Sequence, residues 1–357
     1  MSSSLSAPRT RIILTFLLGI ACLLLLTVVS LAVGSRMMSL PHAWQGFWAH
    51  NHSSDSLVVW KLRLPRTLAA LLVGMALATA GVLMQALTRN PLAEPGLLGI
   101  NSGASLAVVT GITTLGTAAP LHQMWLALAG AMVATTIVFL LGIPRSSTRF
   151  NHISQLLLAG VALNACLSAL TGIITMFNSQ AFDSYRFWVV GAFEGRPLEV
   201  SLTALPFMGV GILLALLVIR PLEALALGDD AATALGAPVT LVRVGTLAAI
   251  ALLCGSATAV AGPISFIGLM IPHFLRLLVG IRLSAILPLS LVFGPLLMLT
   301  ADIIGRVIAI PSEIEAGIVT AFIGAPLLLT LIMRFNSAPA RPRRKAQNIT
   351  QTGGEIV

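Results

Sequence analysis

The stretch Arg63–Gly103 reads RLPRTLAALLVGMALATAGVLMQALTRNPLAEPGLLGINSG and decides the fold. Arg63 and Arg66 frame a proline and precede roughly twenty apolar residues, the length of one membrane crossing. A turn with two prolines and two glycines follows between Arg89 and Gly99, and the chain then becomes apolar again. This order predicts two membrane-spanning helices joined by a tight, charged turn.

The composition extends this interpretation to the whole chain. The 357 residues are 57% hydrophobic and 9% charged, whereas about 25% of a soluble globular protein is charged. The sequence therefore predicts an all-α polytopic membrane protein. The net charge of +9 comes from basic residues scattered over loops, a distribution that does not indicate a nucleic-acid partner.

Ten apolar runs predict about ten transmembrane helices, of which the third and the eighth are short or interrupted by Pro and Gly. The predicted spans are 12–33, 66–87, 96–110, 122–142, 153–176, 199–219, 241–261, 263–280, 284–305 and 316–333. The expected organisation is an N-terminal tail at 1–11, a single transmembrane domain at 12–335 and a disordered tail at 336–357.

The basic residues predict the orientation in the membrane. Ten spans place both termini on one side, and with both tails inside, twice as many of the 21 basic residues lie inside as outside. Both termini are therefore expected in the cytoplasm, with 220–240 as the largest inside loop. Arg63, Arg66 and Arg306 fall on the outside against this rule, which suggests that they have another role.

Several candidate residues have an ordinary structural interpretation. Asp302 precedes Arg306 by four residues, so an intrahelical ion pair is expected. His273 follows Pro272 at an expected helix break, and a structural histidine is favoured over a proton relay. The three cysteines, Cys22, Cys166 and Cys254, lie in apolar runs without CxxC spacing and are expected to pack as small hydrophobic residues.

The outside segment 34–62 carries three tryptophans and three histidines. Aromatic residues at this depth favour a helix lying in the membrane interface. His42, His50 and His52 could bind a metal, but their spacing fits no particular site, so no metal and no cofactor are predicted and their role stays open.

Missing motifs restrict the chemistry. The chain contains no GxxxxGK[ST], and neither of its lysines, Lys61 and Lys345, follows a glycine. Without this phosphate-binding loop the chain is not expected to hydrolyse ATP by itself. It also lacks HExxH, the zinc-protease signature.

A weak internal repeat is present. Gly81–Asn101 and Gly255–Pro272 each contain the end of a long span, a break with Pro and Gly, and a shorter apolar segment. The two copies would cross the membrane in opposite senses. Corresponding breaks in two halves are typical of transporters built on inverted repeats.

Seven ordered motifs together resemble the iron–siderophore and vitamin B12 permease family, with the nearest likeness to ferric enterobactin-type permeases. The motifs are RLPRT (63–67), QALTRNPLAEPGLLGINSGA (85–104), FWVVG (187–191), LGxxAAxALG (227–236), GPISFIGLMIPH (262–273), ADIIGR (301–306) and AFIGAP (321–326). The match extends from about Trp60 to Met333.

The resemblance implies the type II ABC importer permease fold in a bacterial inner membrane. It further implies a second permease subunit, either identical or a sister chain, two cytoplasmic ATP-binding subunits and a periplasmic binding protein. In this family, arginines at the positions of Arg63, Arg66 and Arg306 meet glutamates of the binding protein. Anchoring to lipid headgroups is the alternative role for Arg63 and Arg66.

The resemblance also assigns residues to the ATPase contact and to the path. Within 220–240 a short helix, which Asp229 can cap, is expected to contact the ATPase; an ordinary connecting helix is the alternative. The coupling residues are Leu227, Gly228, Asp229, Ala232, Leu235 and Gly236. The fifth and tenth spans are expected to line the translocation path, with Gln155, Asn164, Ser168, Thr171 and Thr320.

The sequence thus favours the permease subunit of an ATP-driven importer for a ferric siderophore. Vitamin B12 and haem are alternative cargoes within the same family. A proton-coupled secondary carrier and an intramembrane enzyme are alternatives outside it.

Overall fold

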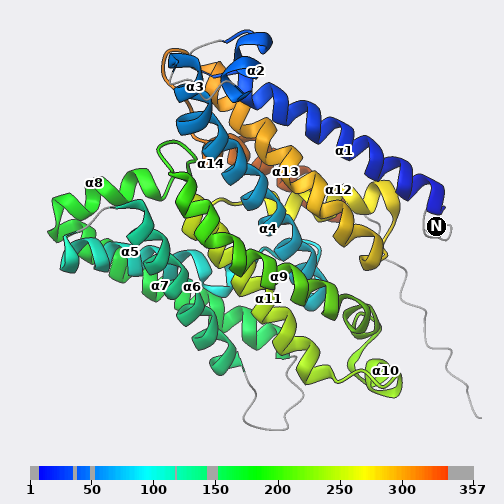
Figure 1. The fold of residues 1–357 in the computed structure, drawn as a ribbon. Coiled ribbons are helices and arrows are strands. Elements are labelled where there is room, and N and C mark those ends of the chain that lie inside the picture. Colours follow the sequence, from blue (N-terminus) through cyan, green and yellow to red (C-terminus); the bar gives the residue numbers. More distant parts are fainter. Residues whose placement is uncertain (1–7, 35–37, 49–52, 117–118, 143–151, 337–357) are drawn as a thin grey trace, which may run out of the picture.

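The computed structural model describes residues 8–34, 38–48, 53–116, 119–142 and 152–336, and every regular element in these ranges is helical (Figure 1). The predictions for the extreme tails, and for His50 and His52, lie outside the described residues.

Each of the ten predicted spans coincides with one helix. These helices are α1 Arg9–Ala32, α4 Leu64–Thr88, α5 Ile100–Leu115, α6 Pro120–Gly142, α7 His152–Phe177, α9 Leu198–Leu225, α11 Val239–Ala261, α12 Ile267–Val279, α13 Leu283–Ile308 and α14 Ala316–Asn336. Seven helices in the described ranges are long and apolar enough to cross a membrane, and α5, α12 and α14 contribute shorter apolar helices. The predicted all-α membrane fold is confirmed.

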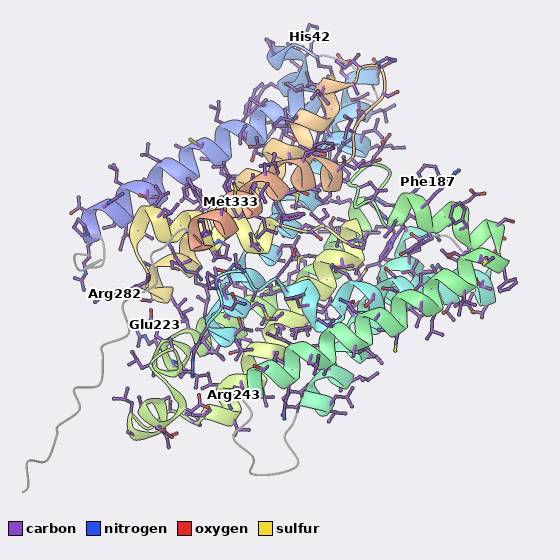
Figure 2. The ribbon with its side chains drawn as sticks, turned by 180° about the vertical axis from the view of Figure 1, so that it is seen from behind. His42, Phe187, Glu223, Arg243, Arg282 and Met333 are labelled. Carbon is purple, nitrogen blue, oxygen red and sulfur yellow. The ribbon has the colours of Figure 1, made fainter. Side chains whose placement is uncertain are left out.

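Four short helices lie between the spans: α2 Leu40–Trp48, α3 Ser54–Val58, α8 Ser179–Trp188 and α10 Asp229–Ala234. A π-helical turn, Val59–Arg63, runs directly into α4. In Figure 2, His42 and Phe187 lie toward one end of the molecule, and Glu223, Arg243 and Arg282 lie toward the other. We call these ends the α2 end and the α10 end.

Several predicted boundaries are wrong by four to six residues, among them the start of the third span and the end of the sixth. The third span was placed at 96–110, but α5 begins only at Ile100, because Pro95–Leu98 form a 3-10 turn and Gly99 takes a left-handed conformation with φ 77°. The sixth span continues to Leu225 with Pro221 inside the helix, so the first residues of the predicted loop 220–240 are helical.

The expected helix break at Pro272 is absent, because α12 runs through this residue. A proline has no N–H to donate to the carbonyl four residues earlier, which here is Gly268 O. Gln85 of α4 compensates, since its Nε2 donates to Gly268 O at 3.2 Å and its Oε1 accepts from Arg276 Nη1 at 2.6 Å. A side chain from a neighbouring helix thus keeps a proline-containing helix continuous, as transmembrane helices require.

Helices α4 and α11 form the centre of the bundle. Four-fifths of the α4 residues are buried, and α4 packs against α13, α11, α9 and α12. Helix α1 lies along one flank and α5–α8 along the other (Figure 1), and most residues of α1 and α7 are not buried. Their apolar outer surfaces suit contact with lipid or with another subunit.

Glycines allow α4 to approach its neighbours closely. An ideal Cβ on Gly74 would lie 2.6 Å from Gly294 O of α13, and one on Gly81 would lie 1.9 Å from Gly268 O of α12. Helices in membranes associate mainly by close packing, which small residues at the contact permit.

We predict that Gly81→Ala destabilises the protein by about 1–3 kcal/mol or more, because the added methyl group must push the α12 backbone away. Thermal unfolding in detergent, followed by tryptophan fluorescence, measures the change. Gly209→Ala in α9 is the matched control, since nothing lies within 4 Å of its added Cβ. The packing argument fails if the two variants unfold at the same temperature.

Candidate functional site: two polar clusters and an exposed helix face

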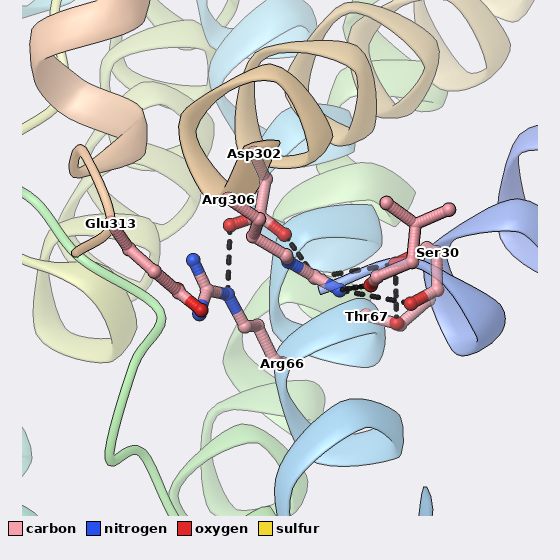
Figure 3. A network of polar contacts seen from close by, with 7 residues as sticks. Ser30, Arg66, Thr67, Asp302, Arg306 and Glu313 are labelled. Carbon is pink, nitrogen blue, oxygen red and sulfur yellow. Dashed lines mark hydrogen bonds and ion pairs between the residues drawn. The ribbon is translucent and has the colours of Figure 1, made fainter. Parts of the chain in front are cut away.

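A buried ion network joins helices at the α2 end of the molecule (Figure 3). Arg66 of α4 donates through Nε to Asp302 Oδ1 at 2.9 Å and through Nη1 to Glu313 Oε2 at 2.5 Å. Asp302 belongs to α13, and Glu313 lies in the connection from α13 to α14. The guanidinium group therefore holds this connection against the first turns of α4.

Arg306 completes the network. Its Nη2 pairs with Asp302 Oδ2, which confirms the predicted intrahelical pair. Its Nη1 donates to Ser30 O of α1 at 2.9 Å, and Ser30 Oγ is 2.7 Å from Thr67 Oγ1 of α4. Asp302 is thus shared by two arginines, and the network ties α1, α4 and α13 together.

The three arginines expected to dock a partner are buried in this structure. The exposed fractions are 5% for Arg63, 8% for Arg66 and 2% for Arg306. Arg63 Nη1 donates to Leu31 O at 2.7 Å. Their side chains are engaged by contacts within the chain, of which the sequence indicated only the Asp302–Arg306 pair, and their docking role stays a prediction.

A cavity of about 800 Å³ lies beside this network. Its lining comes from the turn before α4, from α13 and its following loop, and from the segment 193–199. The charged lining residues are Lys61, Arg63, Arg66, Arg196 and Arg306 together with Glu194, Glu199 and Glu313. Five of the lining residues are thus basic and three are acidic, and Arg66 and Arg306 are paired within the chain.

A second polar cluster lies at the α10 end, where two arginines hold Asp229. Arg89 Nη2 donates to Asp229 Oδ1 at 2.7 Å and to Leu225 O at 2.6 Å, and Arg243 Nη2 donates to Asp229 Oδ2 at 2.6 Å. Arg89 ends α4 in a left-handed conformation with φ 52°, and Arg243 lies in α11. The first residue of α10 is thereby tied to both central helices.

The expected capping role of Asp229 is wrong. Gly228 occupies the N-cap position of α10 without a side-chain hydrogen bond, and Asp229 is the first helical residue. Its carboxylate is engaged by the two arginines instead. Partial burial raises the pKa of Asp229, but hydrogen bonds and charges from Arg89 and Arg243 outweigh this, so the pKa lies below its ordinary value.

The other expected coupling residues divide into two groups. Leu227 and Leu235, at either end of α10, are 72% and 68% exposed, whereas Ala232 is buried. Gly228 and Gly236 take φ values of 122° and 79°, which favour glycine. The short helix thus presents two exposed leucines while its other face packs on the bundle.

The expected path residues do not share one exposed surface. Ser168 of α7 is exposed, whereas Gln155 is half-buried. Thr171 and Thr320 are buried and donate to carbonyls of their own helices, Leu167 O and Gly317 O. Asn164 is half-buried and accepts a hydrogen bond from Ser102 Oγ of α5. The lining role of these residues stays a prediction.

The described histidines give no support for a metal site. His42 Nδ1 lies 2.5 Å from Ser39 Oγ. Within the described ranges no group of three or more His, Cys, Asp or Glu could hold a metal ion.

Sequence reasoning assigned no role to Glu94, which lies between two prolines in the first break and accepts a hydrogen bond from Phe266 N at 2.8 Å. A carboxylate within a break between apolar spans was the available signal, since ionisable groups within a transmembrane domain are rare and usually functional. Its partner, the backbone N–H of Phe266 before α12, has no signature in the sequence.

The fold and the two ion-pair clusters indicate the class of protein: a polytopic helical membrane transport subunit with a polar cluster at each end. Residues 22–334 match the model of the FecCD transport family.

The chain is 44% identical over 335 residues to the ferric enterobactin transport system permease protein FepD of Escherichia coli K12, covering 94% of this chain and 98% of that protein. It is 38% identical to the vitamin B12 import system permease protein BtuC of Salmonella typhi, covering 89% and 95%. A solved structure described as an inward-facing conformation of a metal-chelate type ABC transporter aligns with a TM-score of 0.77 and 29% identity, covering 89% of this chain and 98% of that one.

The chain therefore belongs to the FecCD transport family. It is a transmembrane permease of a binding-protein-dependent ABC importer, and not the ATP-binding subunit.

We predict that Asp302→Asn destabilises the permease by about 3–5 kcal/mol, because it leaves Arg66 and Arg306 buried without their shared counter-charge. Thermal unfolding in detergent measures the loss. Asp183→Asn is the control: Asp183 pairs with Arg186 at 3.2 Å, but both side chains are more than half exposed. That pair contributes less than about 1 kcal/mol. Equal destabilisation by both variants would contradict the assigned importance of the buried network.

Proposed function

We propose that this chain is the permease subunit of an ATP-driven importer that moves a ferric siderophore across the bacterial inner membrane. The observation that carries the proposal is the 44% identity over 98% of a ferric enterobactin permease. The likeness to a vitamin B12 permease, at 38%, makes vitamin B12 the second candidate cargo.

Uptake by the reconstituted complex tests the proposal. The permease is placed in vesicles with its ATP-binding subunits, its binding protein and ATP, and uptake of a ferric catecholate siderophore is compared with that of cyanocobalamin. ATP-dependent uptake of the siderophore is expected. Uptake driven by a proton gradient without the ATP-binding subunits would contradict the proposal, and preference for cyanocobalamin would transfer it to the second cargo.

In this proposal the α10 end faces the cytoplasm, both termini lie there, and 12–335 acts as one transmembrane domain. The excess of basic residues on that side supports this orientation. Two permease subunits, identical or sister chains, enclose the path. The apolar, largely exposed surfaces of α7 and α14 suit contact with lipid and with that second subunit.

Helix α10 is the proposed contact with the ATP-binding subunit. Leu227 and Leu235 provide exposed apolar contacts at its ends, and the small side chains between them allow close approach. The two-arginine clamp on Asp229 supports this role, because a force applied to α10 would pass directly to α4 and α11.

The α2 end is the proposed docking surface for the binding protein. Arg63, Arg66 and Arg306 line the 800 Å³ cavity together with Lys61 and Arg196. The predominance of basic groups would attract acidic side chains of the partner and orient it during approach.

We predict that Asp229→Asn lowers cargo uptake per ATP hydrolysed by roughly fivefold, the factor expected when two partly exposed pairs of about 0.5 kcal/mol each are weakened. Asp230→Asn, at the adjacent position, is the matched control and should change the ratio by less than about twofold. The clamp has no role in coupling if both variants retain the wild-type ratio.

The pH dependence of the Asp229→Asn effect follows from the lowered pKa of Asp229. A depressed native pKa means that the stabilisation by Asp229 is fully present above the ordinary value of 3.8 and is lost only as pH falls below it. The difference between Asp229→Asn and wild type should therefore be constant between about pH 6 and pH 8. A difference that disappears within this range would contradict the assignment.

We predict that Arg63→Glu weakens binding-protein affinity by about tenfold or more at low salt, and by less as salt rises, because reversed charge opposes docking. Surface plasmon resonance with the permease complex in nanodiscs measures the affinity. Arg282→Glu, an exposed residue at the opposite end, is the control. Since Arg63 is buried, the unfolding temperature is measured in parallel, and unchanged affinity of a folded variant would refute the docking role.

A further inference from the structure

The first break, between α4 and α5, rests against α7. Gly160 of α7 has no side chain, and an ideal Cβ there would lie 2.1 Å from Leu97 O. Asn164, one turn further along α7, donates from Nδ2 to Gly96 O at 3.4 Å and accepts from Ser102 Oγ. The backbone of this break thus occupies a notch in α7, and two side-chain contacts hold it there.

The second break, between α11 and α12, rests against α14 in a corresponding way. Phe266 ends this break in a left-handed conformation with φ 72°. Gly324 of α14 accommodates its side chain, since an ideal Cβ on Gly324 would lie 2.3 Å from Phe266 Cγ. Each of the two breaks therefore packs against a glycine of a different outer helix, the first against Gly160 of α7 and the second against Gly324 of α14.

The two breaks are joined to each other. Glu94 Oε1 of the first accepts from Phe266 N of the second at 2.8 Å. Thr258 Oγ1, in the last turn of α11, donates to Asn101 Oδ1, in the first turn of α5, at 3.0 Å. Glu94, Asn101 and residues of α11 and α12 surround a cavity of about 10 Å³, so the junction is closely packed.

We propose that Glu94 and Phe266 form a crossbar that couples the positions of α7 and α14 during transport. A displacement of α7 moves the first break through Leu97 and Gly96, and the Glu94–Phe266 hydrogen bond passes it to the ring that rests on α14. Glu94 is a positioning residue: its task is to place an acceptor oxygen at Phe266 N. This inference rests on the proposed transport function and assigns how two of its helices move together.

Two variants distinguish the role of side-chain length at position 94 from the role of its charge. Glu94→Gln keeps an acceptor oxygen at the same distance from the backbone and removes the charge. Glu94→Asp keeps the charge and shortens the side chain by one methylene group, so that its oxygens fall short of Phe266 N. If the crossbar exists, Glu94→Gln should couple α7 to α14 as wild type does, and Glu94→Asp should lose this coupling.

Spin-label distances between α7 and α14 provide the decisive measurement in the assembled transporter. One label is attached to Cys166, which is exposed on α7, and the other to Phe322→Cys, at a position 78% exposed on α14. The exposed Cys22 is replaced by serine, while the buried Cys254 is left in place. Labelled permease is diluted with unlabelled permease so that distances within one chain dominate.

With and without trapped ATP, wild type and Glu94→Gln should each give one narrow distance distribution. Glu94→Asp should broaden it, because the two helices no longer move as a pair. In unlabelled complexes Glu94→Asp should lower uptake per ATP about tenfold, a factor typical of leaving a buried N–H without its acceptor. Glu94→Gln should restore it to within about twofold.

Either of two results overturns the crossbar. One is a wild-type distribution and wild-type uptake per ATP in Glu94→Asp. The other is failure of Glu94→Gln with retained function in Glu94→Asp, which would assign the role to charge. If wild type itself shows no ATP-dependent uptake, the proposed function fails, and the distance distributions still decide whether the crossbar exists.

Discussion

A helix that is interrupted inside a membrane exposes backbone N–H and C=O groups that no water can satisfy, and each unsatisfied group costs several kcal/mol. Two breaks in this chain, between α4 and α5 and between α11 and α12, leave such groups, as does Pro272 inside α12. Gln85 bonds the carbonyls freed near Pro272, Glu94 accepts from the N–H of Phe266, and Asn164 reaches Gly96 O. Gln85 and Asn164 come from neighbouring helices and Glu94 comes from the other break, so these bonds form only within the folded bundle.

The same constraint explains which parts of the structure could be predicted. Helix number and approximate bounds follow from runs of apolar residues, because burial in lipid dictates composition residue by residue. The start of α5 was misplaced because the left-handed Gly99 decides it, and the end of α9 was misplaced because the helix continues through Pro221 to Leu225. The helix break expected at Pro272 is avoided by Gln85, far away in sequence. Such compensation depends on three-dimensional contact, which composition and spacing do not encode.

The arginines near the α2 end show a similar limit. Their position on the expected outer side departs from the positive-inside rule, and docking of a partner is one explanation for that departure. The structure adds an explanation within the chain: Arg66 and Arg306 share the buried carboxylate of Asp302, and Arg306 also bonds the end of α1. A buried charge must be paired, so these arginines have a structural reason to be present whether or not a partner meets them. Docking and packing are compatible, because both arginines also line the cavity.

Helix α4 connects all of these features. It carries Arg66 in the α2-end network, Gly81 and Gln85 against α12, and Arg89 in the clamp on α10. A single helix, buried along most of its length, thus touches the proposed docking surface, the first turn of α12 and the proposed ATPase contact. Long helices are stiff compared with loops, so motion at α10 that displaces Arg89 would also displace the α4 residues that contact α12 and the α2-end network. The crossbar then determines how that displacement is divided between α7 and α14, the two helices proposed to line the path.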